Sequence, residues 1–207
     1  MSLQGVESLS NSMLTYSICF GATNITVDEA LKHKEWRKAI DDEIEGLQKL
    51  GTYTEVSRPA NQKVISTKFV FADKADGKKK ARFCARGFEQ EYGIDYNETW
   101  APTVGARSLR LLIALAGTEG LSARHIDLPQ AFLNAVLREV IFVEPPKNLA
   151  KEGTVWRLHK ALYVLKQAGR EWHIAFTTCL TKFGFIPSKV DPCQEGGETN
   201  TIAGRAR

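Results

Sequence analysis

The sequence has no long hydrophobic run and no basic start. The longest apolar stretch near the N-terminus is MLTYSICF, Met13–Phe20, which is much shorter than a bilayer span. No lysine or arginine precedes Lys32, so the charged start of a signal peptide is missing. These absences argue against a transmembrane helix and a secretory leader. We therefore expect an intracellular protein, cytoplasmic or nuclear, with no membrane partner.

Cysteine is also scarce, and its spacing excludes two further classes. The four cysteines form no Cys-x-x-Cys pair and have no histidine at metal-ligand spacing, which argues against a disulfide scaffold and a zinc site. The composition is otherwise ordinary, with 207 residues, 43% hydrophobic and 25% charged. Such a chain can bury one sizeable core or two small ones.

Net charge is only +4, so the whole molecule does not by itself indicate a nucleic-acid partner. The positive charge is concentrated in residues 78–86, KKKARFCAR, which contain no acid. Strand side chains alternate between faces. The face with even numbers carries the cations Lys78, Lys80, Arg82 and Arg86, and the other face carries Ala81, Phe83 and Ala85. The sequence thus predicts a strand with one basic and one apolar face.

An amphipathic helix precedes this strand. Thr26 and Glu29 have the spacing of a capping box, and apolar residues then recur every three or four positions until Gly51, a suitable helix stop. The stripe comprises Trp36, Ile40, Ile44, Leu47 and Leu50. The adjacent aspartates Asp41 and Asp42 fall within this helix, and we interpret them as part of a solvated face.

A β-hairpin follows the helix. Residues 63–73 alternate, and Asp73–Gly77 ends in Asp-Gly before the basic strand begins, which is a hairpin pattern. One face of the first strand carries Ile65, Thr67, Phe69 and Phe71. Lys74 lies at the predicted tip. The hairpin can bind phosphate groups, or it can be a solvated edge whose lysines oppose aggregation.

The segment HIDLPQAFLNAVL, His125–Leu137, places a lone carboxylate where a short apolar strand gives way to a short helix. Asp127, held by the rigid backbone of Pro129, can present its oxygens to a hard cation such as Mg²⁺. Alternatively, Asp127 caps the helix that follows. We expect Leu128 to pack into the interior.

Helices and strands are also predicted around this segment. Ser108 can cap an apolar helix that ends near Gly120, and its composition predicts a largely buried helix packed behind the Asp127 strand. VIFVEPP and TVWRLHK read as the two strands of a second hairpin. A further helix starts near Arg170, with a predicted core stripe of Trp172, Phe176, Cys179, Leu180 and Phe183. The last fourteen residues, 194–207, lose periodicity, and we expect a frayed tail.

Several blocks around Asp127 occur in a specific order. They are EWRKAIDDEIEGLQKLGTY, KFVFADKADGKKKAR, KARFCARGFEQEYGIDYNETWAPTV, HIDLPQAFLNAVL, WRLHKALYVLKQAGREW and SKVDPC. In this order the chain, from about Asp28 onward, resembles the reverse transcriptase of copia-type retrotransposons. The resemblance implies an α+β fold of the right-hand polymerase type. Residues 1–27 would be an N-terminal extension, 28–104 a fingers-like region, 105–193 a partial palm of antiparallel strands backed by helices, and 194–207 an irregular tail.

The resemblance also implies a reaction and a set of site residues. A primer 3′-hydroxyl would attack the α-phosphate of a deoxynucleotide on an RNA or DNA template, assisted by Mg²⁺ ions. Asp127 would be the catalytic and metal-binding residue. The nucleotide-binding residues would be Lys74, Lys80, Arg82, Phe132 and Gln167, and the nucleic-acid-binding residues Arg86, Lys166 and Arg170. Phe132 would exclude a 2′-hydroxyl, unless it is a core residue of its helix. The remainder of a Pol polyprotein is a further implied partner.

The chain departs from the family in two respects. No Tyr-x-Asp-Asp occurs after Asp127, and Asp41 and Asp42 are no substitute. Val164 and Gly169 stand where the family commonly has glycine and proline. We therefore expect weakly held Mg²⁺, weak and salt-dependent nucleic-acid binding, and little or no polymerisation by the isolated chain. A non-enzymatic nucleic-acid-binding remnant and an interaction fragment with an unpaired sheet edge remain alternatives.

Overall fold

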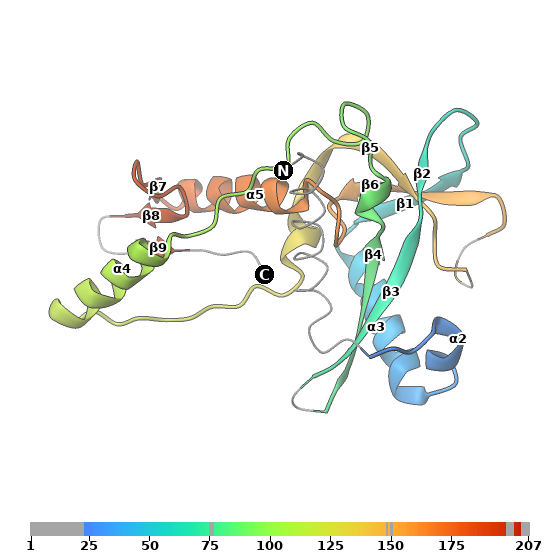
Figure 1. The fold of residues 1–207 in the computed structure, drawn as a ribbon, viewed down its shortest axis with the longest axis horizontal. Helices are drawn as coiled ribbons and strands as arrows, with labels where there is room; N and C mark the ends of the chain where they lie inside the picture. The colour runs from blue at the N-terminus through green and yellow to red at the C-terminus, as the bar shows by residue number, and fades with distance from the viewer. Residues whose placement is uncertain (1–22, 75–76, 148, 150, 198–200, 204–207) are drawn as a thin grey trace, which may run out of the picture.

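The computed structural model describes residues 23–203 apart from 75–76, 148, 150 and 198–200 (Figure 1). Most of the predicted N-terminal extension, including Met13–Phe20 and Cys19, lies outside the described residues. The fold mixes helices with three antiparallel or mixed sheets, so the predicted α+β class is confirmed. Within the described residues, no helix has both the length and the apolar character needed to cross a bilayer.

The first helical segment forms as two helices, α2 (Val27–Ala30) and α3 (Lys34–Lys49). The capping box is confirmed, because the Glu29 carboxylate accepts the Thr26 N–H at 3.0 Å and the Thr26 hydroxyl oxygen accepts the Glu29 N–H at 3.3 Å. The single continuous helix is not formed. The Arg37 guanidinium donates to the Leu31 carbonyl at 2.6 Å, which satisfies the end of α2. The stripe from Trp36 to Leu47 is buried as predicted.

The basic hairpin is confirmed as β3 (Thr67–Asp73) and β4 (Lys79–Ala85), which pair antiparallel with Val70 opposite Arg82. The predicted first strand is divided, because Val64–Ile65 forms a separate strand, β2, that pairs with β5 (Val136–Val143). The division falls at Ser66, whose N–H donates to the Glu89 carboxylate at 2.8 Å instead of to a neighbouring strand.

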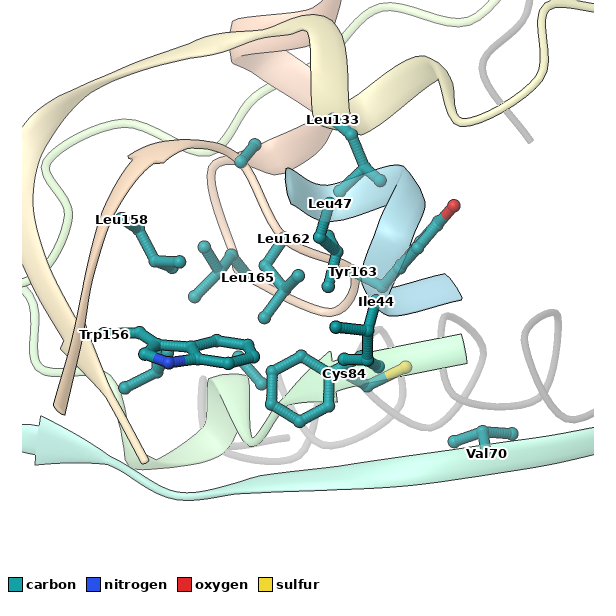
Figure 2. Packing of buried hydrophobic residues seen from close by; sticks show 14 of the residues in the cluster. Ile44, Leu47, Val70, Cys84, Leu133, Trp156, Leu158, Leu162, Tyr163 and Leu165 are labelled. Atoms are coloured by element: carbon teal, nitrogen blue, oxygen red, sulfur yellow. The ribbon is translucent and has the colours of Figure 1, made fainter. Parts of the chain in front are cut away.

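A four-stranded sheet has the order β1-β6-β5-β2. β1 (Tyr53–Ser57), β6 (Thr154–Lys160) and β5 (Val136–Val143) are antiparallel neighbours, so the second predicted hairpin is confirmed. β2 lies parallel to β5. The core includes Trp156 and Leu158 of β6 and Leu47 of α3 (Figure 2). Burial of such side chains contributes roughly 1.5–3 kcal/mol each before entropy is subtracted.

Helix α4 (Ala106–Thr118) contradicts the prediction of a buried helix. It has no buried residue, and Leu111 and Ile113 are 60% and 63% exposed. Figure 1 shows α4 well away from the four-stranded sheet. Residues 121–128 form no strand for it to pack against. Its N-cap is Gly105 rather than the predicted Ser108.

The C-terminal region forms a three-stranded sheet of β7 (Ile186–Pro187), β8 (Gln194–Gly196) and β9 (Thr201–Ala203). The prediction of a frayed tail over residues 194–207 is therefore wrong for β8 and β9. A turn held by Asp191, which accepts the Cys193 N–H at 3.0 Å, brings β8 back to β7. Helix α5 (Ala168–Lys182) precedes this sheet. Its predicted core stripe is only partly confirmed: Leu180 is buried, whereas Cys179 and Phe183 are exposed.

Candidate functional site

Three cations of the hairpin lie close enough to influence one another. Lys80 and Arg82 are half-buried on β4, and Lys74 lies at the tip, where its N–H donates to the Lys78 carbonyl at 2.9 Å. Burial lowers the pKa of Lys80, and the charges of Arg82 and Lys74 lower it further. The negative charges of Glu43 and Asp127 oppose this shift. The structure thus brings together four of these charged groups around Lys80.

Asp127 lies in an exposed, irregular segment, residues 121–128, that runs back from α4 (Figure 1). The predicted strand at this position is wrong, because a strand needs a hydrogen-bonded partner and none is formed here in the described chain. Leu128 is 44% exposed, so its predicted interior packing is also wrong. The predicted short helix exists as the 3₁₀-helix η2 (Ala131–Asn134), but its N-cap is Gln130. The alternative in which Asp127 caps this helix is therefore not supported.

Glu43 is a site residue that the sequence analysis missed. Its side chain is buried, and its carboxylate accepts the Phe83 N–H of β4 at 3.1 Å. The Gln130 side chain stabilises its charge. Burial raises the pKa of Glu43, while the Phe83 N–H and the charges of Lys80 and Arg82 act in the opposite direction. Its position on the apolar stripe of α3 could have indicated a buried, paired carboxylate. The prediction considered only the apolar residues of that stripe and so missed Glu43.

Two aromatic residues lie beside these charged groups. Phe132 of η2 is partly buried, and its ring meets that of Tyr163 edge-on at 6.2 Å. Burial raises the pKa of Tyr163, with a further contribution from the charge of Glu43 and an opposing one from Arg82. Figure 2 shows Tyr163 in the same region of the core as Leu133 and Leu47. The packing of Phe132 fits a core residue of η2, and its place next to Tyr163 is also compatible with the predicted exclusion of a 2′-hydroxyl, which stays a prediction.

Gln167, Lys166 and Arg170 belong to a separate polar network. Gln167 is fully buried, and its amide group donates to the Asp95 carbonyl at 2.9 Å and to Glu139 at 3.3 Å. Its carbonyl oxygen accepts from the Gln90 amide at 3.0 Å. These bonds engage both ends of the amide group. Nucleotide binding by Gln167 stays a prediction, and the contacts observed here are structural.

The two neighbouring cations also have protein partners. Lys166 donates to the Tyr96 hydroxyl at 3.1 Å and lies 4.7 Å from the centre of that ring. Arg170 pairs with Glu98 and, at 3.0 Å, with Glu171. Arg86 is exposed, and its backbone N–H donates to the Ser66 carbonyl at 2.9 Å. Roles for Lys166, Arg170 and Arg86 in nucleic-acid binding stay predictions.

Val164, which stands where the family commonly has glycine, adopts a backbone conformation that favours glycine. Its backbone has φ of 72°, a left-handed conformation that is costly for a β-branched residue. Its carbonyl oxygen would lie 2.1 Å from a Cβ added at Gly87. The strained turn at Val164 and the glycine at position 87 together let the chain after β4 approach the loop that leads to Gln167.

The described residues do not by themselves form a two-metal site. They contain no group of three or more His, Cys, Asp or Glu side chains arranged to hold an ion. Asp127 supplies one exposed carboxylate. The nearby Glu43 is occupied by the Phe83 N–H and Gln130. A divalent cation prefers several oxygen ligands, so Asp127 alone is a poor site for the Mg²⁺ that the family implies.

The structure is an α+β protein in which the basic hairpin and the exposed Asp127 both act on the charge of Lys80. Residues 50–203 match the family described as reverse transcriptase (RNA-dependent DNA polymerase). The chain therefore belongs to the reverse transcriptase family. This match covers most of the chain, including β4 and Asp127.

Curated relatives narrow the membership to the copia-type region. The chain is 36% identical, over 81% of its length, to the Retrovirus-related Pol polyprotein from transposon TNT 1-94 of Nicotiana tabacum. It is 32% identical over 80% of its length to the Retrovirus-related Pol polyprotein from transposon RE1 of Arabidopsis thaliana. It is 31% identical over 76% of its length to the Truncated transposon Ty1-A Gag-Pol polyprotein of Saccharomyces cerevisiae.

The chain spans only a small part of these polyproteins, 14%, 12% and 14% of their respective lengths. No solved structure matches the chain. The predicted identification as a retrotransposon reverse transcriptase region is thus confirmed by sequence relatives, and the activity of a whole Pol protein does not follow from it.

Proposed function

We propose that this chain supplies the triphosphate-binding portion of a retrotransposon RNA-directed DNA polymerase. In this proposal residues 28–104 are the fingers and residues 105–193 part of the palm of a right-hand polymerase. The observation that carries it is that the charges of Lys74, Arg82 and Asp127 all act on Lys80 of the same hairpin. Family membership supports the same assignment, since the described arrangement pairs phosphate-binding cations with a metal-binding type of side chain.

The charges of the site favour a polyanionic ligand. The shift of Lys80 toward a lower pKa means that burial and neighbouring cations together outweigh the stabilisation from Glu43 and Asp127. A triphosphate would reverse that balance. Arg82 offers a planar fork that matches phosphate oxygens, while Lys74 and Lys80 act as mobile point charges. All three cations would also neutralise the charge that develops as pyrophosphate leaves.

The remaining predicted residues take supporting roles in this proposal. Phe132 would lie under the sugar and disfavour a 2′-hydroxyl. Gln167, bonded to Gln90 and Asp95, would support the backbone beneath the nucleotide. Lys166, Arg170 and Arg86 would contact the template–primer. The other parts of a Pol polyprotein would supply whatever groups complete catalysis.

Asp127 is the acid that would bind a divalent ion together with the nucleotide phosphates. Bound Mg²⁺ would supply Lewis-acid stabilisation of the phosphate oxygens. Because the described residues offer one suitable carboxylate, the isolated chain should bind a nucleotide yet extend a primer little or not at all. Robust primer extension by the wild-type chain in Mg²⁺ or Mn²⁺ that vanishes in Asp127→Ala would contradict the expected inactivity.

Triphosphate binding is the direct test of the proposed function. Affinity for a fluorescent deoxynucleoside triphosphate is measured by anisotropy over a salt series. Lys80→Ala and Arg82→Ala should each weaken binding severalfold and flatten its salt dependence. Lys49→Ala, which removes an exposed cation of α3 that pairs with Glu45, is the matched control and should leave affinity unchanged. Equal affinities for all four proteins would refute the proposal.

A further inference from the structure

Glu43 lies where three separate segments of the chain meet. It belongs to α3, and its carboxylate accepts the N–H of Phe83 in β4 at 3.1 Å. The Gln130 side chain, which packs on Gly46 of the same helix, stabilises its charge. Phe83 directly follows Arg82, and Gln130 is three residues after Asp127. One buried carboxylate therefore connects the basic strand with the segment that carries the acid.

Gln130 is well suited to transmit this connection. Its backbone is left-handed, with φ of 54° and ψ of 36°, a conformation that a non-glycine residue keeps only when its surroundings impose it. Its amide nitrogen would lie 2.5 Å from a Cβ added at Gly46, so the side chain packs directly on α3. Its carbonyl oxygen accepts the Leu133 N–H at 2.9 Å and so begins η2, the helix of Phe132.

A second contact joins the chain after Asp127 to β4 farther along: the Phe132 ring packs against Tyr163, and the Tyr163 carbonyl accepts the Ala85 N–H at 3.1 Å. Residues 121–129 are all exposed and have no strand partner. An exposed segment without backbone pairing depends on its end contacts for its position. Those contacts begin at Gln130.

We infer that Glu43 is a positioning residue that, through Gln130, holds Asp127 at a set distance from Lys80 and Arg82. The inference rests on the proposed function for the part that concerns triphosphate binding. Glu43 does not touch the nucleotide in this arrangement. It orients the carboxylate that does so through a metal ion.

The first test requires no ligand. Hydrogen–deuterium exchange is measured at the Leu133 and Ala135 N–H groups, which donate to the Gln130 and Phe132 carbonyls, in the wild-type chain and three variants. Glu43→Ala should increase exchange at these two groups by tenfold or more, whereas Glu43→Gln should stay within about threefold of wild type, because a glutamine can accept the Phe83 N–H and bond Gln130. Glu45→Ala is the control, since Glu45 is exposed on the same helix. Unchanged exchange in Glu43→Ala would overturn the inference.

The second test asks whether the connection acts on Asp127. Affinity for a deoxynucleoside triphosphate is measured with and without Mn²⁺ in Gln130→Ala, Asp127→Ala and the double variant. Gln130→Ala should keep metal-free affinity within about twofold while losing the gain that Mn²⁺ gives the wild-type chain. The double variant should be no weaker than Asp127→Ala. A general structural defect would instead lower metal-free affinity in every variant.

The outcomes separate the inference from the proposed function. Absence of metal-free binding that depends on Lys80 and Arg82 would refute the proposed function, and the exchange experiment would still decide whether Glu43 positions the segment. Additive effects of the Gln130 and Asp127 substitutions would overturn the inference while leaving triphosphate binding intact. A wild-type chain that gains nothing from Mn²⁺ would overturn it as well, because no metal-linked role of Asp127 would remain for Glu43 to support.

Discussion

Replacing Gly87 by alanine should destabilise the chain, although alanine normally stabilises a backbone. The added Cβ would lie 2.1 Å from the Val164 carbonyl oxygen and 3.1 Å from its carbonyl carbon. The contact is with backbone, so no side-chain rotation can relieve it. The neighbouring Leu162 and Leu165 are 1% and 4% exposed, which leaves the loop little room to move.

The magnitude follows from two opposing effects. Overpacking of this kind costs roughly 1–3 kcal/mol, and the lower entropy of the unfolded alanine chain offsets roughly 0.4–1 kcal/mol. Taking the middle of each range, the free energy of unfolding should fall by about 1.3 kcal/mol. For a chain of this size the melting temperature should then fall by roughly 3–5 °C.

Thermal and urea unfolding followed by circular dichroism measure this effect. The matched control is Gly117→Ala in α4, where an added Cβ meets no atom within 4 Å and alanine is the better helix former by up to about 1 kcal/mol. The same chemical change should thus lower stability at position 87 and leave it equal or higher at position 117. A Gly87→Ala variant as stable as wild type would show that the close approach to Val164 is not present.

Three further predictions concern side chains. Hydrogen bonds from the Ser108 hydroxyl and from the Gly105 and Cys193 N–H groups lower the pKa of Asp191, so its ionised form stabilises the fold above the ordinary pKa of an aspartate, and this stabilisation is lost as the pH falls through the lowered value. Asp191→Asn should therefore lower the melting temperature at pH 7, and the difference from wild type should shrink below about pH 4. A difference that stays constant with pH would contradict this prediction. Gln167→Leu should lower stability by about 1–3 kcal/mol by leaving buried partners unpaired, whereas lost nucleotide affinity at an unchanged melting temperature would support a direct nucleotide contact. Phe132→Val should raise the affinity for ATP relative to dATP if the ring excludes a 2′-hydroxyl, and an unchanged ratio would leave Phe132 a core residue.

Elements set by local chemistry were predictable from the sequence. The Thr26–Glu29 capping box, the buried stripe of α3 and the β3–β4 hairpin all depend on residues close together in the chain, and all three form. The β5–β6 hairpin does so as well. In each case, propensity, turn residues and hydrophobic period indicate the same structure, which is the condition under which local inference succeeds.

Elements that need a distant partner were not predictable in the same way. The apolar composition of α4 predicted burial, yet burial depends on another surface, and none of its residues is buried in the described structure. The strand at Asp127 failed for the same reason. The opposite error occurred at β8, where a short polar segment forms a strand because the turn at Asp191 supplies a partner.

The candidate site shows the same division. The cations of β4 were readable from alternation, because their shared face follows from strand geometry. Glu43, Gln130 and Tyr163 were not, since their importance lies in contacts between α3, β4 and the segments after α4 and β6. A carboxylate on a buried helical stripe is costly unless it is paired. The presence of Glu43 between Ile40 and Ile44 was the one sequence feature that could have indicated a hydrogen-bond partner for a buried carboxylate.

The positive charges around Lys80 are only partly balanced by the acids that act on them. Lys80 is partly desolvated and repelled by Arg82 and Lys74, and these effects exceed the attraction from Glu43 and Asp127. Glu43 is itself held in a buried position that disfavours its charge. Removing either acid would increase the repulsion among the cations, whereas adding an anion would relieve it. Because Glu43 accepts the Phe83 N–H of β4 and Asp127 is exposed, the proposed triphosphate with its own divalent ion would contact the cations and the exposed carboxylate together.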